Sequence, residues 1–148
     1  MNTTVATKQS DIRRVWHHID ANGKILGRIA THIAELLMGK QKPYFVSHLD
    51  CGDYVVITNA KDVVVTGKKE VQKKYYRHSG YPGGFRQETL DKRRLRRPED
   101  IIKNAVKGML PQNKLRDQML KRLFIYAGGE HPYQDKLKTQ NSNVKTAS

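Results

Sequence analysis

Residues 15–40 read VWHHIDANGKILGRIATHIAELLMGK, and this stretch decides the fold class. Residues 15–19 are short, bulky and β-branched at both ends, and turn-forming residues follow at 20–23, so a strand and a turn are predicted. From Ile25 to Leu37 the apolar residues recur at helical spacing, and the glycine that follows shortly after suits the end of a helix. The stretch therefore predicts a strand, a turn and a helix in that order.

The rest of the chain repeats this alternation. Residues 53–58 (DYVVIT) and 63–65 (VVV) are predicted to be strands, and the first has so little polar alternation that we expect it to be buried on both faces. A helix is predicted to begin at Pro98, which precedes two carboxylates and a continuing apolar face. A short helix at 115–120 and a strand at 123–126 follow. Together these segments predict an α/β layer structure with a largely parallel or mixed sheet.

The length of 148 residues fits one domain. Residues 1–14 are polar and lack a hydrophobic period, so we expect them to form a flexible arm. Residues 15–133 are predicted to be the single folded domain, and residues 134–148 a polar, structureless tail. The lone cysteine, Cys51, cannot form an intrachain disulfide and is not enough for a Cys-rich zinc site, so no metal or other cofactor is expected.

Lys and Arg number 28 against 14 Asp and Glu, which gives a net charge of +14. So large an excess predicts a polyanionic partner, either nucleic acid or an anionic membrane. A membrane partner would call for an amphipathic helix with aromatic anchors or a lipidation signal, and the sequence has neither. It also lacks a long apolar run and the apolar stretch of a secretory signal. We therefore expect a soluble, cytoplasmic protein that binds nucleic acid.

More than half of this excess lies in residues 68–97, KKEVQKKYYRHSGYPGGFRQETLDKRRLRR, which carry 11 basic and 3 acidic side chains. The flanks of the glycine-rich loop at 80–84 are predicted to form a basic β-hairpin that projects from the main sheet. Lys and Arg neutralise phosphates and aromatic rings stack on unpaired bases, so this hairpin is predicted to bind RNA. The alternative is a solvated charge run with its tyrosines in the core. The interleaved aromatic residues are Tyr75, Tyr76, His78, Tyr81 and Phe85.

Two parts of this segment have candidate roles of their own. Gly80, Gly83 and Gly84 could expose amide groups that receive a phosphate, although a plain hairpin turn explains them equally well. The arginines at 93–97 carry planar guanidinium groups, whose paired N–H donors match the oxygens of a phosphate. Further Lys and Arg residues follow on the predicted helices. The candidate RNA-binding residues are Lys68, Lys69, Lys73, Lys74, Tyr75, Arg77, His78, Gly80, Gly83, Gly84, Arg86, Lys92, Arg93, Arg94, Arg96, Arg97, Lys103, Lys107, Lys114, Arg116, Lys121 and Arg122.

Two patterns raise the alternative of an enzyme. TGKK at residues 66–69 resembles the end of a phosphate-binding loop, but Asp62 stands where the earlier glycine is required and a lysine stands where Ser or Thr is required. His48, Asp50 and Asp53 could hold the metal of a nuclease, because hard cations prefer carboxylate oxygens. No further carboxylate cluster supports that site, so no catalytic residue and no small-molecule substrate are predicted.

Five stretches follow one another between Trp16 and Tyr133: WHHIDANGKILGRIATHIAELLMGK, HLDCGDYVVITNAKDVVVTGKK, KKYYRHSGYPGG, RRPEDIIKNAVKGMLPQNKL and LFIYAGGEHPY. In content and order they resemble the large-subunit ribosomal protein thirteen family of the bacterial and organellar type. The combination of VKGMLP with a later YAG is especially specific. The resemblance covers nearly the whole predicted domain.

The resemblance implies an α/β fold with a central mixed sheet flanked by helices, and no enzymatic activity. It implies a structural role in the large ribosomal subunit, in which the protein binds and organises large-subunit rRNA early in assembly beside neighbouring large-subunit proteins. A free regulator of mRNA is a third alternative. We expect the protein in the ribosome, whether that ribosome is cytoplasmic or organellar.

Overall fold

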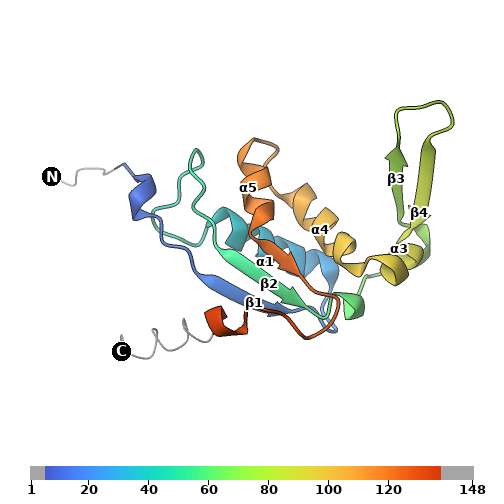
Figure 1. Ribbon diagram of the computed structural model, residues 1–148, viewed down its shortest axis with the longest axis horizontal. Coiled ribbons are helices and arrows are strands. Elements are labelled where there is room, and N and C mark those ends of the chain that lie inside the picture. Colours follow the sequence, from blue (N-terminus) through green and yellow to red (C-terminus); the bar gives the residue numbers. More distant parts are fainter. Residues whose placement is uncertain (1–5, 138–148) are drawn as a thin grey trace.

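A computed structural model describes residues 6–137, and Figure 1 shows its elements. Three strands form a parallel sheet with β2 (Tyr54–Thr58) in the centre, between β1 (Trp16–Asp20) and β5 (Leu123–Ile125). In the register of this sheet His17 lies opposite Val55, which in turn lies opposite Leu123. The α/β class predicted from the sequence is confirmed.

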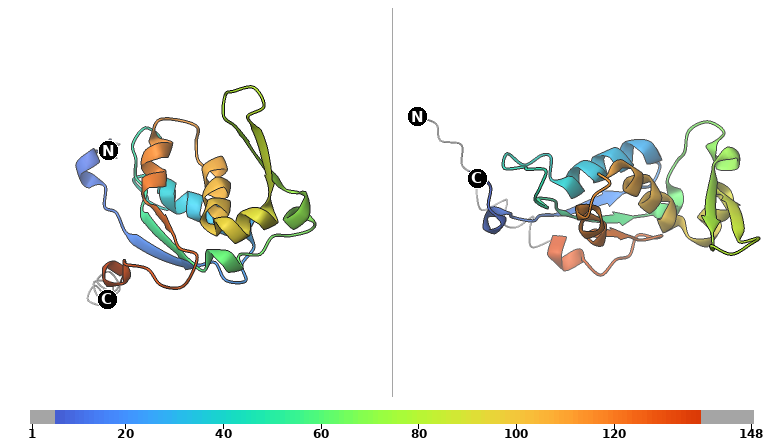
Figure 2. Two further views of the ribbon diagram at one scale, coloured as in Figure 1. Left: turned by 45° about the vertical axis from the view of Figure 1, so that its right-hand side comes forward. Right: turned by 90° about the horizontal axis from the view of Figure 1, so that it is seen from above.

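Helices α1 (Leu26–Met38) and α4 (Pro98–Met109) cover one face of the parallel sheet, as the view from above in Figure 2 shows. Each has one apolar face, and these faces meet each other and the inward side chains of β2. α5 (Leu115–Lys121) packs beside α1 and leads into β5. Core side chains with no exposed surface include Ile33, Leu37, Val55, Ile57, Ile102 and Val106.

The opposite face of the sheet is covered by the chain that follows β5. Trp16 stacks on Tyr54 with ring centroids 4.4 Å apart, and Tyr133 stacks on Trp16 at 5.0 Å. Phe124 lies 4.5 Å from Tyr133 and completes the cluster. Val56 points to this face and has no exposed surface. The central strand is therefore buried on both faces, as its sequence predicted.

A second, antiparallel sheet stands at one end of the molecule, away from the parallel sheet (Figure 1). Residues 79–84 join its two strands, and a short helix flanks the pair on each side. We call residues 68–97 the hairpin unit. Its elements are α2 (Lys69–Gln72), β3 (Lys74–His78), β4 (Phe85–Thr89) and α3 (Leu90–Arg96).

No helix was predicted at α3, and two further segments differ from the prediction in their local structure. Residues 63–65 do not form a strand. Val64 makes one parallel bridge with Ile25, but the segment that carries Ile25 enters α1 at the next residue, so the pairing cannot continue. Residues 134–137 are helical although no regular structure was predicted after Tyr133. Contact with the sheet explains the helix, since the Lys136 ammonium lies 4.8 Å from the centre of the Trp16 ring.

Two 3₁₀ turns complete the elements, η1 (Gln9–Asp11) and η2 (Ala60–Asp62). The first lies in the segment that we expected to be a flexible arm, and Thr7 Oγ1 donates there to the carbonyl oxygen of Tyr44 at 3.0 Å. The flexibility of residues 1–14 stays a prediction. The tail from residue 138 onward falls outside the described residues.

Candidate nucleic-acid interface

The antiparallel pair places two positive charges directly opposite each other. Arg77 of β3 is the cross-strand partner of Arg86 of β4, and both residues are exposed. Within the described part of the chain neither has a carboxylate partner. Like charges that face each other in this way destabilise a sheet. A phosphate placed between the two guanidinium groups would remove the repulsion, so this pair suits an anionic ligand.

Three aromatic side chains are exposed on the same hairpin. Tyr76 is 65% exposed, Tyr81 75% and Phe85 58%. The rings of Tyr76 and Phe85 stack with centroids 5.7 Å apart and 22° between their planes. Exposed rings of this kind offer faces on which unpaired bases stack. The alternation of side chains along a strand predicted that Tyr75 and Tyr76 lie on opposite faces of the hairpin. It did not show which of the two faces is exposed.

Tyr75, the tyrosine that we selected as a candidate, faces the rest of the hairpin unit. It is half-buried, and the guanidinium carbon of Arg93 lies 4.8 Å from the centre of its ring. Burial raises the pKa of the Tyr75 phenol against the opposing effect of Arg93 and Arg94. The phenol therefore stays protonated at neutral pH and can donate a hydrogen bond.

Arg94 ties the hairpin unit to the body of the protein. Its guanidinium donates to both carboxylate oxygens of Glu70, at 2.8 and 3.1 Å. It also donates to the carbonyl oxygens of Lys61 and Val63, each at 2.7 Å. These four bonds occupy the guanidinium group that we predicted to bind phosphate. Arg94 is a positioning residue for the unit.

Two more arginines of α3 have carboxylate partners. Arg93 Nη2 lies 3.0 Å from Asp100 of α4, and Arg96 Nη2 lies 2.8 Å from Glu88 of β4. These acids lie seven and eight residues from their arginines, but on other elements, so no local period pointed to the pairing and the sequence showed a uniform cationic cluster. The structure divides it into arginines that hold α3 in place and the exposed Arg97 beside them.

The glycine-rich loop uses the amides of Gly80 and Gly84 internally. Gly80 N–H donates to His78 Nδ1 at 2.9 Å, and Gly84 N–H donates to the Tyr81 carbonyl at 2.9 Å. Gly83 has a left-handed φ of 71°, which favours glycine. A side chain at Gly84 would lie 2.0 Å from Ser79 Oγ. The glycines are explained by the turn, and we assign no phosphate to their amides.

Most of the remaining candidate residues are exposed cations. Lys69 and Lys73 also line a cavity between the hairpin unit and the helices. Arg116 is half-buried, and its buried Nε has no hydrogen-bond partner among the described residues. Among the candidate residues, the exposed cations for which the described part of the chain shows no ion pair are Lys68, Lys69, Lys73, Lys74, Arg77, Arg86, Lys92, Arg97, Lys103, Lys107, Lys114 and Lys121.

Arg122 differs from every other candidate because it is buried. Its side chain is 8% exposed and forms a two-bond ion pair with Asp50. Its guanidinium also donates to the carbonyl oxygens of Leu37 and Asp53, each at 3.2 Å. All of its donors serve the interior of the protein, so we leave Arg122 out of the interface. The sequence offered one signal that Arg122 is buried, namely its position directly before the apolar strand at 123–125.

Asp53 belongs to the same buried network and not to a metal site. Lys42 Nζ lies 2.5 Å from Asp53 Oδ1, His17 Nε2 lies 3.0 Å from Oδ2, and the Val15 amide donates to Oδ1 at 2.9 Å. Burial alone would raise the pKa of this carboxyl, but the hydrogen bonds from His17, Lys42 and Val15 lower it below its usual value. Asp53 is thus a carboxylate fixed by its partners.

The nuclease hypothesis also lacks the geometry of a metal centre. Within residues 6–137 no three His, Cys, Asp or Glu side chains are grouped so that they could hold a metal ion. His48 is exposed, whereas Asp50 is occupied by Arg122 and lies 3.6 Å from Arg14. The Asp50 carboxylate therefore neutralises the buried Arg122.

Comparison with known proteins decides the family. A sequence model of ribosomal protein L13 matches residues 14–132. The chain belongs to the ribosomal protein L13 family. Relatives named large ribosomal subunit protein uL13 include one from Dehalococcoides mccartyi, 56% identical over 130 residues, which are 88% of this chain and 91% of the relative. The relative from Symbiobacterium thermophilum is 50% identical over 133 residues, 90% of this chain and 93% of the relative.

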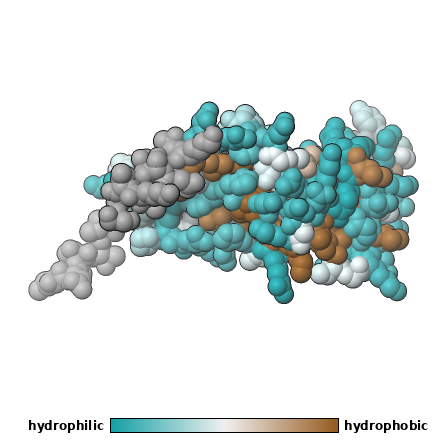
Figure 3. Space-filling model, turned by 90° about the horizontal axis from the view of Figure 1, so that it is seen from below, coloured by the Kyte–Doolittle hydropathy of each residue, from teal (hydrophilic) through white to brown (hydrophobic). Residues whose placement is uncertain are grey.

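Membership in the L13 family separates the two main functional hypotheses. The chain is a structural ribosomal protein rather than an enzyme, as the resemblance implied. None of its described helices is long and apolar enough to cross a membrane. On the face seen in Figure 3 hydrophilic surface predominates and apolar patches are small, which agrees with a surface that meets a charged partner.

Proposed function

We propose that this L13-family chain binds and organises rRNA of the large ribosomal subunit, with the hairpin unit as its principal contact. The observation that carries the proposal is the exposed, unpaired charge of the antiparallel pair, where Arg77 faces Arg86. Cations in this setting displace counterions from phosphates, and the exposed rings of Tyr76 and Phe85, on the other face of the hairpin, offer surfaces on which bases stack. The ion pairs of α3 support the proposal, because they hold the hairpin in one orientation.

The cations of α4 and α5 extend the proposed contact beyond the hairpin. Lys103 and Lys107 lie on the polar face of α4, and Lys114 and Lys121 lie at the two ends of α5. Their ammonium groups act as point charges for phosphate and carry no base specificity. Neighbouring large-subunit proteins are proposed as further partners, and early assembly is the proposed time of binding.

The experiment measures how salt changes the affinity for a large-subunit rRNA fragment. Three exposed cations of the hairpin unit, Lys74, Arg77 and Arg86, are replaced together by Ala. Each lost phosphate contact flattens the slope of log affinity against log salt by about 0.7 to 0.9, so we expect a slope flatter by about 2 to 3.

The matched control replaces three exposed cations from the N-terminal part of the chain, outside the hairpin unit, Lys8, Arg13 and Lys40, by Ala. It removes the same charge but should leave the slope nearly unchanged. Circular dichroism confirms that both variants are folded. Equal slopes in the two folded variants would show that the hairpin charge is only solvated and would overturn the proposal.

A further inference from the structure

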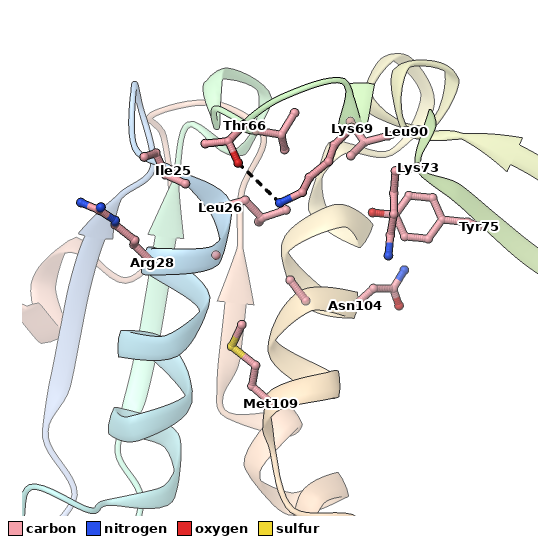
Figure 4. Close-up of a pocket in the computed structure, with 13 residues that line it drawn as sticks. Ile25, Leu26, Arg28, Thr66, Lys69, Lys73, Tyr75, Leu90, Asn104 and Met109 are labelled. Carbon is pink, nitrogen blue, oxygen red and sulfur yellow. Dashed lines mark hydrogen bonds between the residues drawn. The ribbon is translucent and has the colours of Figure 1, made fainter. Parts of the chain in front are cut away.

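A cavity of about 730 Å³ lies between the hairpin unit and helices α1 and α4 (Figure 4). Its floor is apolar and includes Leu26 of α1, Leu90 of α3 and Met109 of α4. Met109 is 44% exposed although it lies between two packed helices. A volume of this size is in the range of sites for small ligands, roughly 300–1,000 Å³. The protein's own side chains leave this apolar surface uncovered.

The polar groups of the cavity are cationic or neutral. Lys69 and Lys73 extend from the hairpin side, and Asn104 projects from α4 below Tyr75 (Figure 4). Among residues 6–137, the one polar contact of Lys69 Nζ is a long one, 3.5 Å to Thr66 Oγ1. Among the described residues that line the cavity there is no Asp or Glu. An apolar floor below two lysines fits a ligand that joins an apolar ring to an anionic group.

We propose that this cavity receives one unpaired nucleotide of large-subunit rRNA. Its base lies on the apolar floor between Leu26 and Met109, and its phosphates meet Lys69 and Lys73. The amide of Asn104 and the phenol of Tyr75 can form hydrogen bonds with the donors and acceptors at the edges of an extruded base. The inference rests on the proposed function and deepens it, because it assigns a specific site for a base outside the exposed hairpin.

Two substitutions close the cavity without changing charge. Gly27 of α1 lines it, and a Cβ atom added there meets no atom within 4 Å, so the side chain of Gly27→Leu starts in open space. Ala105→Leu narrows the same cavity from α4. Gly108→Leu is the matched control, since Gly108 is also helical, meets no atom within 4 Å and lies outside the cavity.

The test is the affinity of each folded protein for a large-subunit rRNA fragment at several salt concentrations. Stacking and burial of a base change affinity by about tenfold or more, so Gly27→Leu and Ala105→Leu should each bind about tenfold more weakly. Their salt slopes should flatten by about 0.7 for each phosphate contact with Lys69 or Lys73 that is lost with the nucleotide, while the contacts of the exposed hairpin keep the rest of the slope. Gly108→Leu should bind as the unchanged chain does.

A second readout uses the methyl resonances of Met109 and Leu26. A short single-stranded RNA should shift both resonances, and inorganic phosphate alone should not. Unchanged affinity in both cavity variants, or an equal loss in Gly108→Leu, would overturn the nucleotide site while leaving rRNA binding intact. Failure of the unchanged chain to bind rRNA would overturn the proposed function itself, and the inference with it.

Discussion

Arg77 and Arg122 carry the same guanidinium group in opposite environments. Arg77 is exposed on β3 and faces another arginine, whereas Arg122 is buried against Asp50 at the start of β5. A buried charge is tolerated only when its donors are satisfied, and Arg122 uses them on one carboxylate and two carbonyls. Environment therefore separates a structural arginine from one available to a ligand.

At the residue scale, breaking the buried pair should cost far more stability than breaking an exposed one. Arg122→Met removes the two-bond ion pair from the buried Asp50 carboxylate and leaves it Arg14 at 3.6 Å, and we expect the free energy of unfolding to fall by about 3–5 kcal/mol. The control is Arg96→Met, whose side chain is 65% exposed beside Glu88 and whose loss should cost about 1 kcal/mol or less. Chemical denaturation measures both, and a similar loss in the two variants would contradict the assigned roles.

Asp53 makes stability depend on pH. Its folded-state pKa is lower than the usual 3.8, so its stabilising effect is complete above that value and is lost as the pH falls through the folded-state pKa. We expect the free energy of unfolding to decline from about pH 5 downward. In Asp53→Asn, which cannot titrate, this decline should be shallower. Parallel pH profiles of the two proteins, from denaturation at each pH, would show that Asp53 is not the group responsible.

At the scale of elements, the hairpin is arranged for binding at the expense of its own stability. Replacing one of two facing arginines by a β-branched residue, Arg77→Thr, should raise the free energy of unfolding by about 0.5 kcal/mol. The same change should weaken rRNA binding and flatten its salt slope by about 1. Thermal unfolding measures the stability of Arg77→Thr, and binding at several salt concentrations measures its rRNA affinity. A loss of both stability and affinity would mean that the arginines support the fold instead.

The elements also show what sequence reasoning can reach. Helices α1, α4 and α5 were predicted because their apolar residues recur at helical spacing, and strands β1, β2 and β5 because each is a short run of bulky, largely apolar residues. α3 was not, since LDKRRLR is charged on nearly all sides and its partners Glu70, Glu88 and Asp100 come from other elements. Ion pairs between different elements leave no periodic pattern in the sequence. The same limit applied to the arginine cluster, which looked uniformly available for RNA.

At the scale of the whole molecule, charge and fold occupy different regions. The parallel sheet and helices α1 and α4 enclose the apolar core, while more than half of the net charge of +14 lies in the hairpin unit at one end (Figure 1). The uneven distribution was visible in the sequence and located the candidate interface. The cavity at the junction was not, because its lining comes from four separate segments of the chain that only the tertiary structure brings together.

The central claim is that the hairpin unit is the part of this protein that touches rRNA, and cross-linking in intact large subunits tests it most directly. Ultraviolet light joins aromatic side chains to bases that stack on them, and mass spectrometry identifies the joined peptides. We predict cross-links at Tyr76, Tyr81 or Phe85, whose rings are exposed, and none at Tyr54, whose ring stacks on Trp16 within the sheet cluster. Cross-links confined to the sheet cluster, with none in residues 68–97, would contradict the claim.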